Sequence, residues 1–287
     1  MAQPSIGQRF FRPITQFIPY RTRQRLLRFT RDIRSLPERL QPGSRPLPWS
    51  FMHDVGGGDF YGVGRIIRDK LIAEAGLQPH HHVLDIGCGT GRVAFALTEY
   101  LNAEGLYTGF DVNLDGLIWM MRHLPKTEAG FRIVRADVHN TEYRPDVSAP
   151  AAGYRFPASD ASVDVVFATS VFTHLRAGDA ENYFREIGRC LKPGGTAYVT
   201  LFAMTPERWA LAEAGKAFIP FERFGDGAYV GSSDVPEATI AFDEPIILGW
   251  IAAAGLTVAA PMQAGGWSNS DPSRELQDVL LLRRAGA

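Results

Sequence analysis

Short apolar runs and helical repeats alternate along most of this chain, and each block predicts one secondary-structure element. Runs rich in β-branched and aromatic residues predict seven strands, at residues 82–87, 106–111, 131–136, 163–169, 195–202, 256–261 and 277–283. Apolar residues at helical spacing predict helices between them, at 91–101, 114–123, 179–191 and 243–254. This alternation is typical of a doubly wound α/β domain, a parallel sheet with helices on both faces.

Two connections break the regular alternation. Residues 138–160 and 203–242 are longer than ordinary links between elements, so they are expected to form lid-like insertions or to carry function. The strand at 163–169 is nearly continuous in apolar residues, as a strand buried on both faces should be. We therefore expect residues 51–287 to form one domain with two insertions.

The first 50 residues follow a different pattern. A helix is predicted over residues 21–36 because apolar residues recur at spacings of 3 and 4, namely Leu26, Phe29, Ile33, Leu36 and Leu40. Pro37 is expected to end or kink this helix. Residues 41–50 are rich in proline and read as a linker. Residues 1–50 thus form an N-terminal helical extension, a basic amphipathic arm with its linker.

Charge is divided unevenly between this arm and the rest of the chain. Residues 1–45 contain ten arginines, no lysine, and only Asp32 and Glu38 as acids, a net charge of +8. The remainder carries a net charge of −9, so the total of −1 hides the asymmetry. The arm is expected first to pack on the acidic body as a lid or to pair in a homodimer. Contact of residues 21–40 with an anionic membrane surface is the second reading. No nucleic-acid partner is expected, because the body is acidic.

The cysteine count and the N-terminal composition predict a cytoplasmic protein. Two cysteines do not make a disulfide framework, and the N-terminus lacks the apolar core of a signal peptide. Residues 245–262 carry no charge over 18 positions, the length of a membrane span. Gly255 divides this run, so a helix followed by a buried strand is the better explanation.

The stretch Val83–Gly91 carries the most chemical information. Its apolar run stops at three glycines spaced two apart, Gly87, Gly89 and Gly91, and a helical pattern follows at once. Glycine allows a positive φ and lets a ligand lie against bare backbone. The following helix offers unpaired N–H groups to that ligand. The stretch therefore predicts a strand, a ligand-binding turn and a helix.

Two acids narrow the choice of ligand. Asp111 ends the second strand, twenty residues after Gly91, where an acid can accept hydrogen bonds from ribose hydroxyls. Asp85 precedes the turn and could orient it or meet a ligand amine. The third glycine comes one residue too early for the dinucleotide fingerprint G-x-G-x-x-G, which counts against a dinucleotide-dependent oxidoreductase.

Together these motifs resemble those of the class I S-adenosylmethionine-dependent methyltransferases. The resemblance lies in VLDIGCGTGR at 83–92, residues 109–111 and 135–137, VDVVFATSVFTHL at 163–175, and LKPGG at 191–195. It implies a Rossmann-like seven-stranded sheet whose last strand is antiparallel. It also implies S-adenosylmethionine as cofactor, S-adenosylhomocysteine as product, and methyl transfer as the reaction.

The resemblance further implies roles for matched positions. The three glycines would pass close to the methionine part of the cofactor, and Asp111 would hold the ribose. Asp137, with Val138, would meet the adenine edge, and Ser170 would line the site near the reacting sulfonium. The expected cofactor contacts also include Asp85, Cys88, Arg92 and Val112.

The acceptor is less well defined. Residues 57–60, 107–111, 170–174, 266–267 and 277–278 resemble a subset of these enzymes found beside sugar- and polysaccharide-building genes. We expect transfer to an oxygen of a small molecule or glycan. A nitrogen acceptor, a lipid or natural-product acceptor, and a non-catalytic cofactor-binding module remain as alternatives.

His174 is the candidate catalytic residue. It follows the fourth strand, where ligands bind in open α/β sheets, and it could take a proton from a substrate hydroxyl. Alternatively it caps the next helix or holds its loop. His80, His81 and His82 are consecutive, cannot easily share one ion, and are read as a solvated loop, so no metal is expected.

Overall fold

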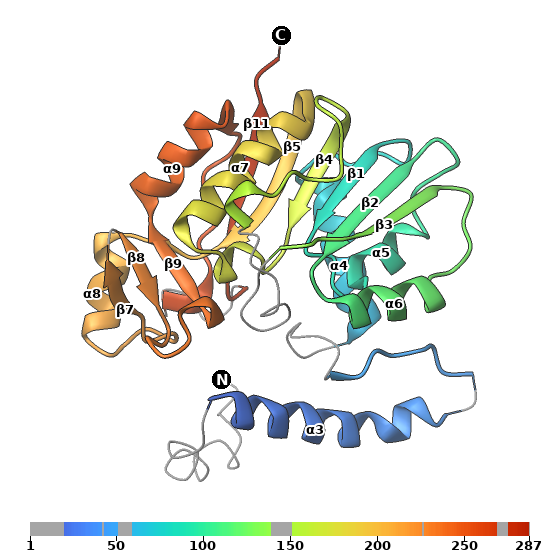
Figure 1. Cartoon of the computed structure of the whole chain (residues 1–287), viewed down its shortest axis with the longest axis horizontal. Coiled ribbons are helices and arrows are strands. Elements are labelled where there is room, and N and C mark those ends of the chain that lie inside the picture. Colours follow the sequence, from blue (N-terminus) through green and yellow to red (C-terminus); the bar gives the residue numbers. More distant parts are fainter. Residues whose placement is uncertain are drawn as a thin grey trace. The chain divides into compact units, whose positions relative to one another are not determined.

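A computed structural model describes residues 20–41, 43–50, 59–138, 151–225, 227–268 and 275–286. The chain divides into two compact units, Met1–Gly56 and Gly57–Ala287. Each unit is described by itself below (Figure 1).

The first unit contains helix α3, Tyr20–Arg39. Its stripe of apolar residues agrees with the predicted helix, and the helix includes Pro37 and ends at Arg39, two residues after it. A proline this close to the C-terminus removes only one hydrogen bond from the last turn, a loss that the preceding turns tolerate. The next six described positions after Gly43 form an irregular linker.

The second unit is built on a seven-stranded sheet, as the sequence predicts. Its order is β10-β11-β5-β4-β1-β2-β3. The strands are β1 His82–Ile86, β2 Leu106–Asp111, β3 Gly130–Arg135, β4 Val163–Ala168, β5 Leu191–Leu201, β10 Leu256–Val258 and β11 Asp278–Arg284. Strands β1 to β5 pair in parallel, and β11 pairs antiparallel with both β5 and β10. The antiparallel last strand is therefore confirmed.

One detail of the predicted strands is wrong. Strand β10 lies at the edge of the sheet, and Thr257 and Val258 are exposed, so it is not a buried strand. The division of the uncharged run is nevertheless confirmed. Helix α9, Glu244–Ala253, ends before Gly255, which has a φ of +68° and leads into β10. Within the described residues, no helix has the length and apolar character that crossing a bilayer requires.

Helices cover both faces of the sheet (Figure 1). They are α4 Phe60–Ala73, α5 Arg92–Leu97, α6 Leu114–His123, α7 Ala177–Cys190 and α9. Leu84 and Ile86 of β1 belong to one core cluster together with Phe184 of α7 and Ile251 of α9. Val83 is equally buried but lies outside that cluster, because successive strand residues point to opposite faces.

Helices α4 and α5 pack unusually closely against each other. A Cβ added at Gly64 would lie 2.1 Å from the carbonyl oxygen of Arg92, so only glycine fits there. Because α5 follows the glycine turn directly, its close contact with α4 also holds the turn in position.

The insertion at 203–242 forms a second, four-stranded sheet that the sequence did not reveal. Its order is β6-β9-β8-β7, from Ala203–Met204, Ile240–Asp243, Ala228–Val230 and Glu222–Gly225. Helix α8, Pro206–Glu213, belongs to the same insertion. A separate cluster of buried apolar residues, among them Phe202, Tyr229 and Trp267, forms its core.

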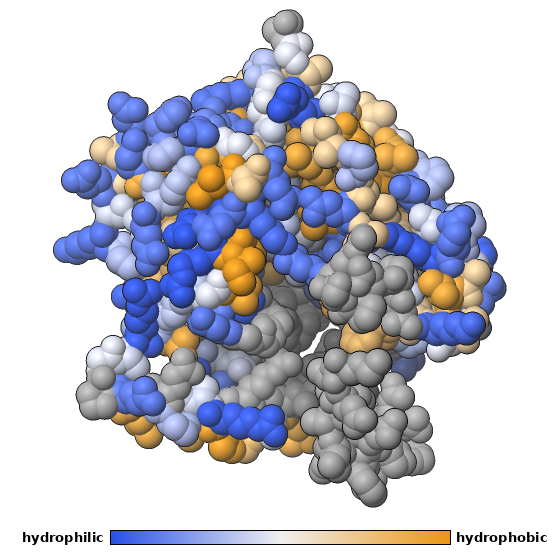
Figure 2. All heavy atoms as spheres, turned by 180° about the vertical axis from the view of Figure 1, so that it is seen from behind, coloured by the Kyte–Doolittle hydropathy of each residue, from blue (hydrophilic) through white to orange (hydrophobic). Residues whose placement is uncertain are grey.

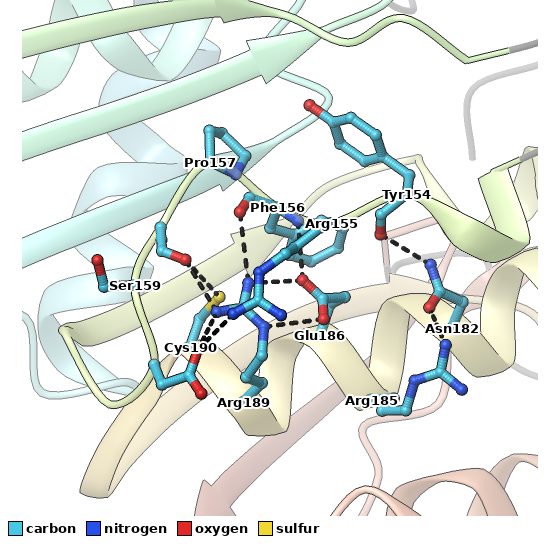
Figure 3. Close-up of polar contacts among 12 residues, drawn as sticks. Tyr154, Arg155, Phe156, Pro157, Ser159, Asn182, Arg185, Glu186, Arg189 and Cys190 are labelled. Atoms are coloured by element: carbon cyan, nitrogen blue, oxygen red, sulfur yellow. Dashed lines mark hydrogen bonds and ion pairs between the residues drawn. The ribbon is translucent and has the colours of Figure 1, made fainter. Parts of the chain in front are cut away.

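The described part of the other insertion, residues 151–160, is tied to α7 (Figure 3). Glu186 accepts a hydrogen bond from the backbone N–H of Phe156 at 2.8 Å. Arg189 donates to the carbonyl oxygen of Ala158 at 2.9 Å and pairs with Glu186 at 2.6 Å. Asn182 donates to the carbonyl oxygen of Tyr154 at 3.0 Å. Residues 139–150, the rest of the expected lid, lie outside the described residues.

Candidate active site

The candidate site lies at the carboxyl edge of the parallel strands, where ligands bind in open α/β sheets. The glycine turn follows β1 there, Asp111 ends β2, and the loop from Ser170 to His174 follows β4 (Figure 1). Strand β11 runs the opposite way, so its first residue, Asp278, pairs with Leu201 at the end of β5. The antiparallel strand thereby brings Gln277 to the same edge.

All three glycines of the turn have a positive φ. The angles are +71° at Gly87, +53° at Gly89 and +82° at Gly91. A Cβ at Gly87 would lie 2.4 Å from Cγ2 of Val171, and one at Gly91 would lie 2.3 Å from Sδ of Met120. The turn therefore needs glycine both for its conformation and for its close contact with the loop after β4.

Asp111 holds the turn from the neighbouring strand. Its Oδ2 accepts a hydrogen bond from the N–H of Gly89 at 2.8 Å, and its Oδ1 accepts one from the N–H of Asn113 at 2.8 Å. Burial raises the pKa of Asp111, and these N–H groups act against that rise. A carboxylate can accept about four hydrogen bonds, so Asp111 retains acceptor capacity for ribose hydroxyls.

Asp85 lies beneath the turn and is only 3% exposed. The hydroxyl of Tyr107 donates to its Oδ2 at 2.7 Å. Burial raises the pKa of Asp85 to about 8, against the effect of the Tyr107 hydrogen bond. Cys88 is also buried, and burial raises the pKa of its thiol well above the usual value. This placement supports the orienting alternative for Asp85, since a buried carboxyl group has little surface to offer a ligand.

The remaining expected cofactor contacts lie around the same edge. Asp137 is exposed just after β3, whereas Val138 is buried in the core at 3% exposure. Val112 follows Asp111 and is partly buried. The guanidinium of Arg92 lies 5.8 Å from the ring centre of Phe60.

Ser170 joins three strands through hydrogen bonds. Its N–H donates to Oγ1 of Thr200 at 2.8 Å, and Oγ1 of Thr200 donates to Oε1 of Gln277 at 2.5 Å. Nε2 of Gln277 donates to Oγ of Ser170 at 3.0 Å. Ser170 has a φ of +62°, a strained conformation for a residue other than glycine. Sequence reasoning did not assign Thr200 or Gln277 to the site, because only the antiparallel pairing of β11 brings them together.

His174 is exposed and belongs to a short 3₁₀ turn, Phe172–His174. Its Nδ1 lies 2.9 Å from the carbonyl oxygen of Glu237, which comes from the 203–242 insertion. A carbonyl oxygen only accepts, so Nδ1 carries a proton, and in the neutral ring Nε2 is then the basic nitrogen. The contact also shows that the insertion adjoins the loop after β4.

Two other sequence interpretations can be compared with the structure. The solvated-loop interpretation is wrong for His82, whose ring nitrogens lie 3.0 Å from the carbonyl oxygen of Ser162 and 3.0 Å from Oγ1 of Thr108. Trp267, within the stretch 266–267 that resembles the sugar-associated subset, is fully buried in the core of the insertion. In the described ranges, no group of His, Cys, Asp and Glu side chains could hold a metal ion.

Comparisons with known proteins agree with this geometry. Residues 83–195 match the family described as a methyltransferase domain. An arsenite methyltransferase of Aquipseudomonas alcaligenes is 29% identical over 167 residues, 58% of this chain and 42% of that protein. The ubiquinone/menaquinone biosynthesis C-methyltransferase UbiE of Pseudoalteromonas translucida is 26% identical over 155 residues, 54% and 55% of the two chains. The chain thus spans about half the length of these curated relatives.

A solved structure shows the same fold. The S-adenosylmethionine-dependent methyltransferase of Methanosarcina mazei aligns with a TM-score of 0.50 at 18% identity, covering 77% of this chain and 98% of that one. Sheet order, glycine turn and matched domain together define the class. Residues 83–195 thus match a methyltransferase domain, and the second unit has the fold of the class I S-adenosylmethionine-dependent methyltransferases, a class that implies S-adenosylmethionine as cofactor.

Proposed function

We propose that this protein transfers a methyl group to a hydroxyl oxygen of a small molecule or glycan. The observation that carries the proposal is the contact of His174 Nδ1 with the carbonyl oxygen of Glu237 at 2.9 Å. It leaves Nε2 as the basic nitrogen of a histidine beside the sheet edge, as deprotonation of a hydroxyl requires. Relatives named as C-methyltransferases and as an O-methyltransferase bear on the class of reaction, not on this acceptor.

The cofactor fits the residues present. The glycine turn offers bare backbone for the methionine part, and Asp111 has acceptor capacity for the ribose hydroxyls. Asp137 and the backbone at Val138 would meet the adenine edge. S-adenosylmethionine supplies an electrophilic methyl group on a sulfonium.

The protein's own residues then have three tasks. Ser170 and Gln277 form a polar wall on the acceptor side and orient the hydroxyl. His174 would take the proton of an acceptor hydroxyl on Nε2, and bound S-adenosylmethionine would supply the methyl group and leave as S-adenosylhomocysteine. Holding the two reactants in line supplies most of the acceleration, because the methyl group is already activated.

Calorimetry with S-adenosylhomocysteine tests the cofactor site. Asp111→Ala should weaken binding by about 1–3 kcal/mol, the scale for losing a hydrogen-bonded charged group. Asp115→Ala is the matched control, since Asp115 is an exposed acid four residues further on and should leave the affinity unchanged. Equal affinities of the two variants would contradict the ribose role.

Turnover across a panel of hydroxyl and amine acceptors tests the reaction. His174→Ala should reduce turnover by about 10²–10⁴-fold while cofactor affinity is retained, if a general base acts. Glu237→Ala keeps the backbone carbonyl that orients His174 and serves as the control. If only amines are methylated, the protein is an N-methyltransferase and the proposed oxygen acceptor is wrong. Cofactor binding with no turnover on any acceptor would favour the non-catalytic module.

A further inference from the structure

Helix α3, together with Leu40 directly after it, carries a row of exposed apolar side chains. Five residues at spacings of 3 and 4 are between 38% and 78% exposed, namely Leu26, Phe29, Ile33, Leu36 and Leu40. This spacing places them on one stripe, here called the α3 stripe. Single exposed apolar residues are common on soluble proteins, but a contiguous stripe marks an interaction surface. Figure 2 shows apolar atoms along the lower margin of this helix.

The linker occupies a different face of the same helix. Arg39 donates to the carbonyl oxygens of Leu47 at 2.5 Å and Pro48 at 2.8 Å. The Trp49 ring centre lies 4.0 Å from the Arg39 guanidinium carbon. These contacts fold residues 47–49 back along the helix and hold them there.

A second contact fixes the end of the linker. Oδ1 of Asp32 accepts a hydrogen bond from the N–H of Ser50 at 2.7 Å, and Asp32 is only 8% exposed. At 100° per residue, Asp32 and Arg39 lie about 100° around the helix from the centre of the α3 stripe. The linker therefore covers a polar flank and leaves the stripe exposed.

Arginine positions flank the stripe on both sides. Seven arginines lie within Tyr20–Arg39, against two acids, Asp32 and Glu38. Positions 23 and 34 fall on one side of the stripe, and positions 21 and 25 on the other, each about 60–120° from its centre. Asp32 is already engaged by backbone, so the field around the stripe is strongly positive.

We propose that α3 binds the surface of an anionic membrane. The helix is about 30 Å long and would lie in the plane of the interface, with the α3 stripe between the acyl chains and the arginines on lipid phosphates. An apolar stripe with cationic flanks is complementary to this boundary and to no purely polar surface. The linker contacts keep the helix ordered without occupying the stripe.

The positive charge of the arm and the apolar character of the α3 stripe disfavour other binding partners. Two arms of net charge +8 would repel each other if their stripes paired in a dimer. Nucleic acid would attract the arginines but would leave the stripe in water. The acidic remainder of the chain could attract the arm, and a competition between the two surfaces is part of the test.

Sedimentation of the full-length protein with lipid vesicles tests the proposal. Binding is expected to vesicles of phosphatidylcholine mixed with phosphatidylglycerol, with much weaker binding to phosphatidylcholine alone and weakening as salt is added. The double substitution Phe29→Ser and Ile33→Ser leaves the charge unchanged and should lower partitioning by about tenfold or more. The double substitution Arg23→Gln and Arg34→Gln should lower it by about tenfold on anionic vesicles only.

Exposed apolar residues of the second unit provide the matched control. The double substitution Phe218→Ser and Leu248→Ser removes side chains that are 73% and 43% exposed and should leave partitioning as in the wild type. Absence of wild-type binding to anionic vesicles would overturn the proposal. So would binding that is insensitive to the stripe substitution, because contact would then be electrostatic only.

Light scattering and urea unfolding distinguish the other two possible partners of the α3 stripe, a second copy of the chain and the protein's own acidic surface. A dimer that the stripe substitution dissociates, without vesicle binding, would assign the α3 stripe to a second copy. Loss of stability in the stripe variant, without vesicle binding, would assign it to the protein's own acidic surface. Neither readout depends on methyl transfer, so the proposal stands apart from the proposed function.

Discussion

The hydroxyl of Tyr107 donates a 2.7 Å hydrogen bond to Oδ2 of Asp85, beneath the glycine turn. The two side chains come from neighbouring strands, and Asp85 pairs in register with Gly109. A Cβ at Gly109 would lie 2.5 Å from the Tyr107 hydroxyl oxygen. Because Gly109 has no side chain, the Tyr107 hydroxyl has room to reach Asp85.

This buried pair predicts a pH-dependent stability. Burial raises the pKa of Asp85 to about 8, far above its unfolded value of about 3.9. Between these values the folded protein keeps a proton that the unfolded chain has released, so the free energy of unfolding falls as the pH rises. Asp85→Asn cannot titrate. The stability of the wild type relative to Asp85→Asn should fall by up to about 1.4 kcal/mol per pH unit.

Urea unfolding of both proteins at about pH 6 and about pH 7.5 measures this difference. Tyr107→Phe provides a second check. It removes a donor that favours the ionised carboxyl, so the pKa of Asp85 should rise further and the decline should continue to higher pH. Parallel pH profiles of wild type and Asp85→Asn would show that Asp85 is ionised throughout this range.

The next prediction concerns Gly87. An alanine there would need a positive φ and would place its Cβ 2.4 Å from Val171 Cγ2. Gly87→Ala should therefore displace the Ser170–His174 loop and lower both cofactor affinity and stability, the latter by about 1–3 kcal/mol. Calorimetry and urea unfolding measure the two effects.

Val171→Ala separates the clash from the backbone strain. In the Gly87→Ala and Val171→Ala double variant, Cγ2 is gone and only the positive φ remains. About 1 kcal/mol of destabilisation should then persist beyond that of Val171→Ala alone. A double variant as impaired as Gly87→Ala would mean that the turn itself, not its contact with the loop, is disturbed.

Sequence patterns predicted the main sheet because its strands are long and apolar. The glycine turn and Asp111 were found for a related reason, since their roles depend on local backbone and on position at a strand end. The small sheet was missed because its strands have two to four residues and Glu222–Gly225 is exposed throughout. Gln277 was missed as a site residue because its partner Ser170 lies 107 residues away in sequence.

Two substitutions of Ser170 test whether its positive φ strains the backbone. Ser170→Ala and Ser170→Gly both remove the hydroxyl that Gln277 contacts, but only glycine relieves the φ of +62°. The glycine variant should be more stable than the alanine variant by about 0.5–1 kcal/mol in urea unfolding. Equal stability of the two Ser170 variants would show that the site relaxes without strain.

Gln277→Ala should raise KM for the acceptor and leave cofactor affinity unchanged.

The last prediction concerns the ion pair of Arg208 with Asp278, which joins α8 of the insertion to β11. Asp278 is fully buried and accepts hydrogen bonds from both terminal nitrogens of Arg208, at 3.0 and 2.9 Å. The N–H of Ala203, the N–H of Gly265 and the indole of Trp267 also donate to it. Asp278→Asn would leave the Arg208 charge buried without its counter-charge and should cost about 3–5 kcal/mol.

A double-mutant cycle with Arg208→Met measures the coupling. If the cost of Asp278→Asn comes from the stranded Arg208 charge, the double variant should be more stable than the sum of the single losses predicts. Arg155→Gln is the control, because the Arg155 ion pair with Asp160 is exposed and its loss should barely change urea unfolding. Additive losses at positions 208 and 278 would mean that Asp278 acts through its backbone and indole donors. The insertion would then be held to the main sheet without the ion pair.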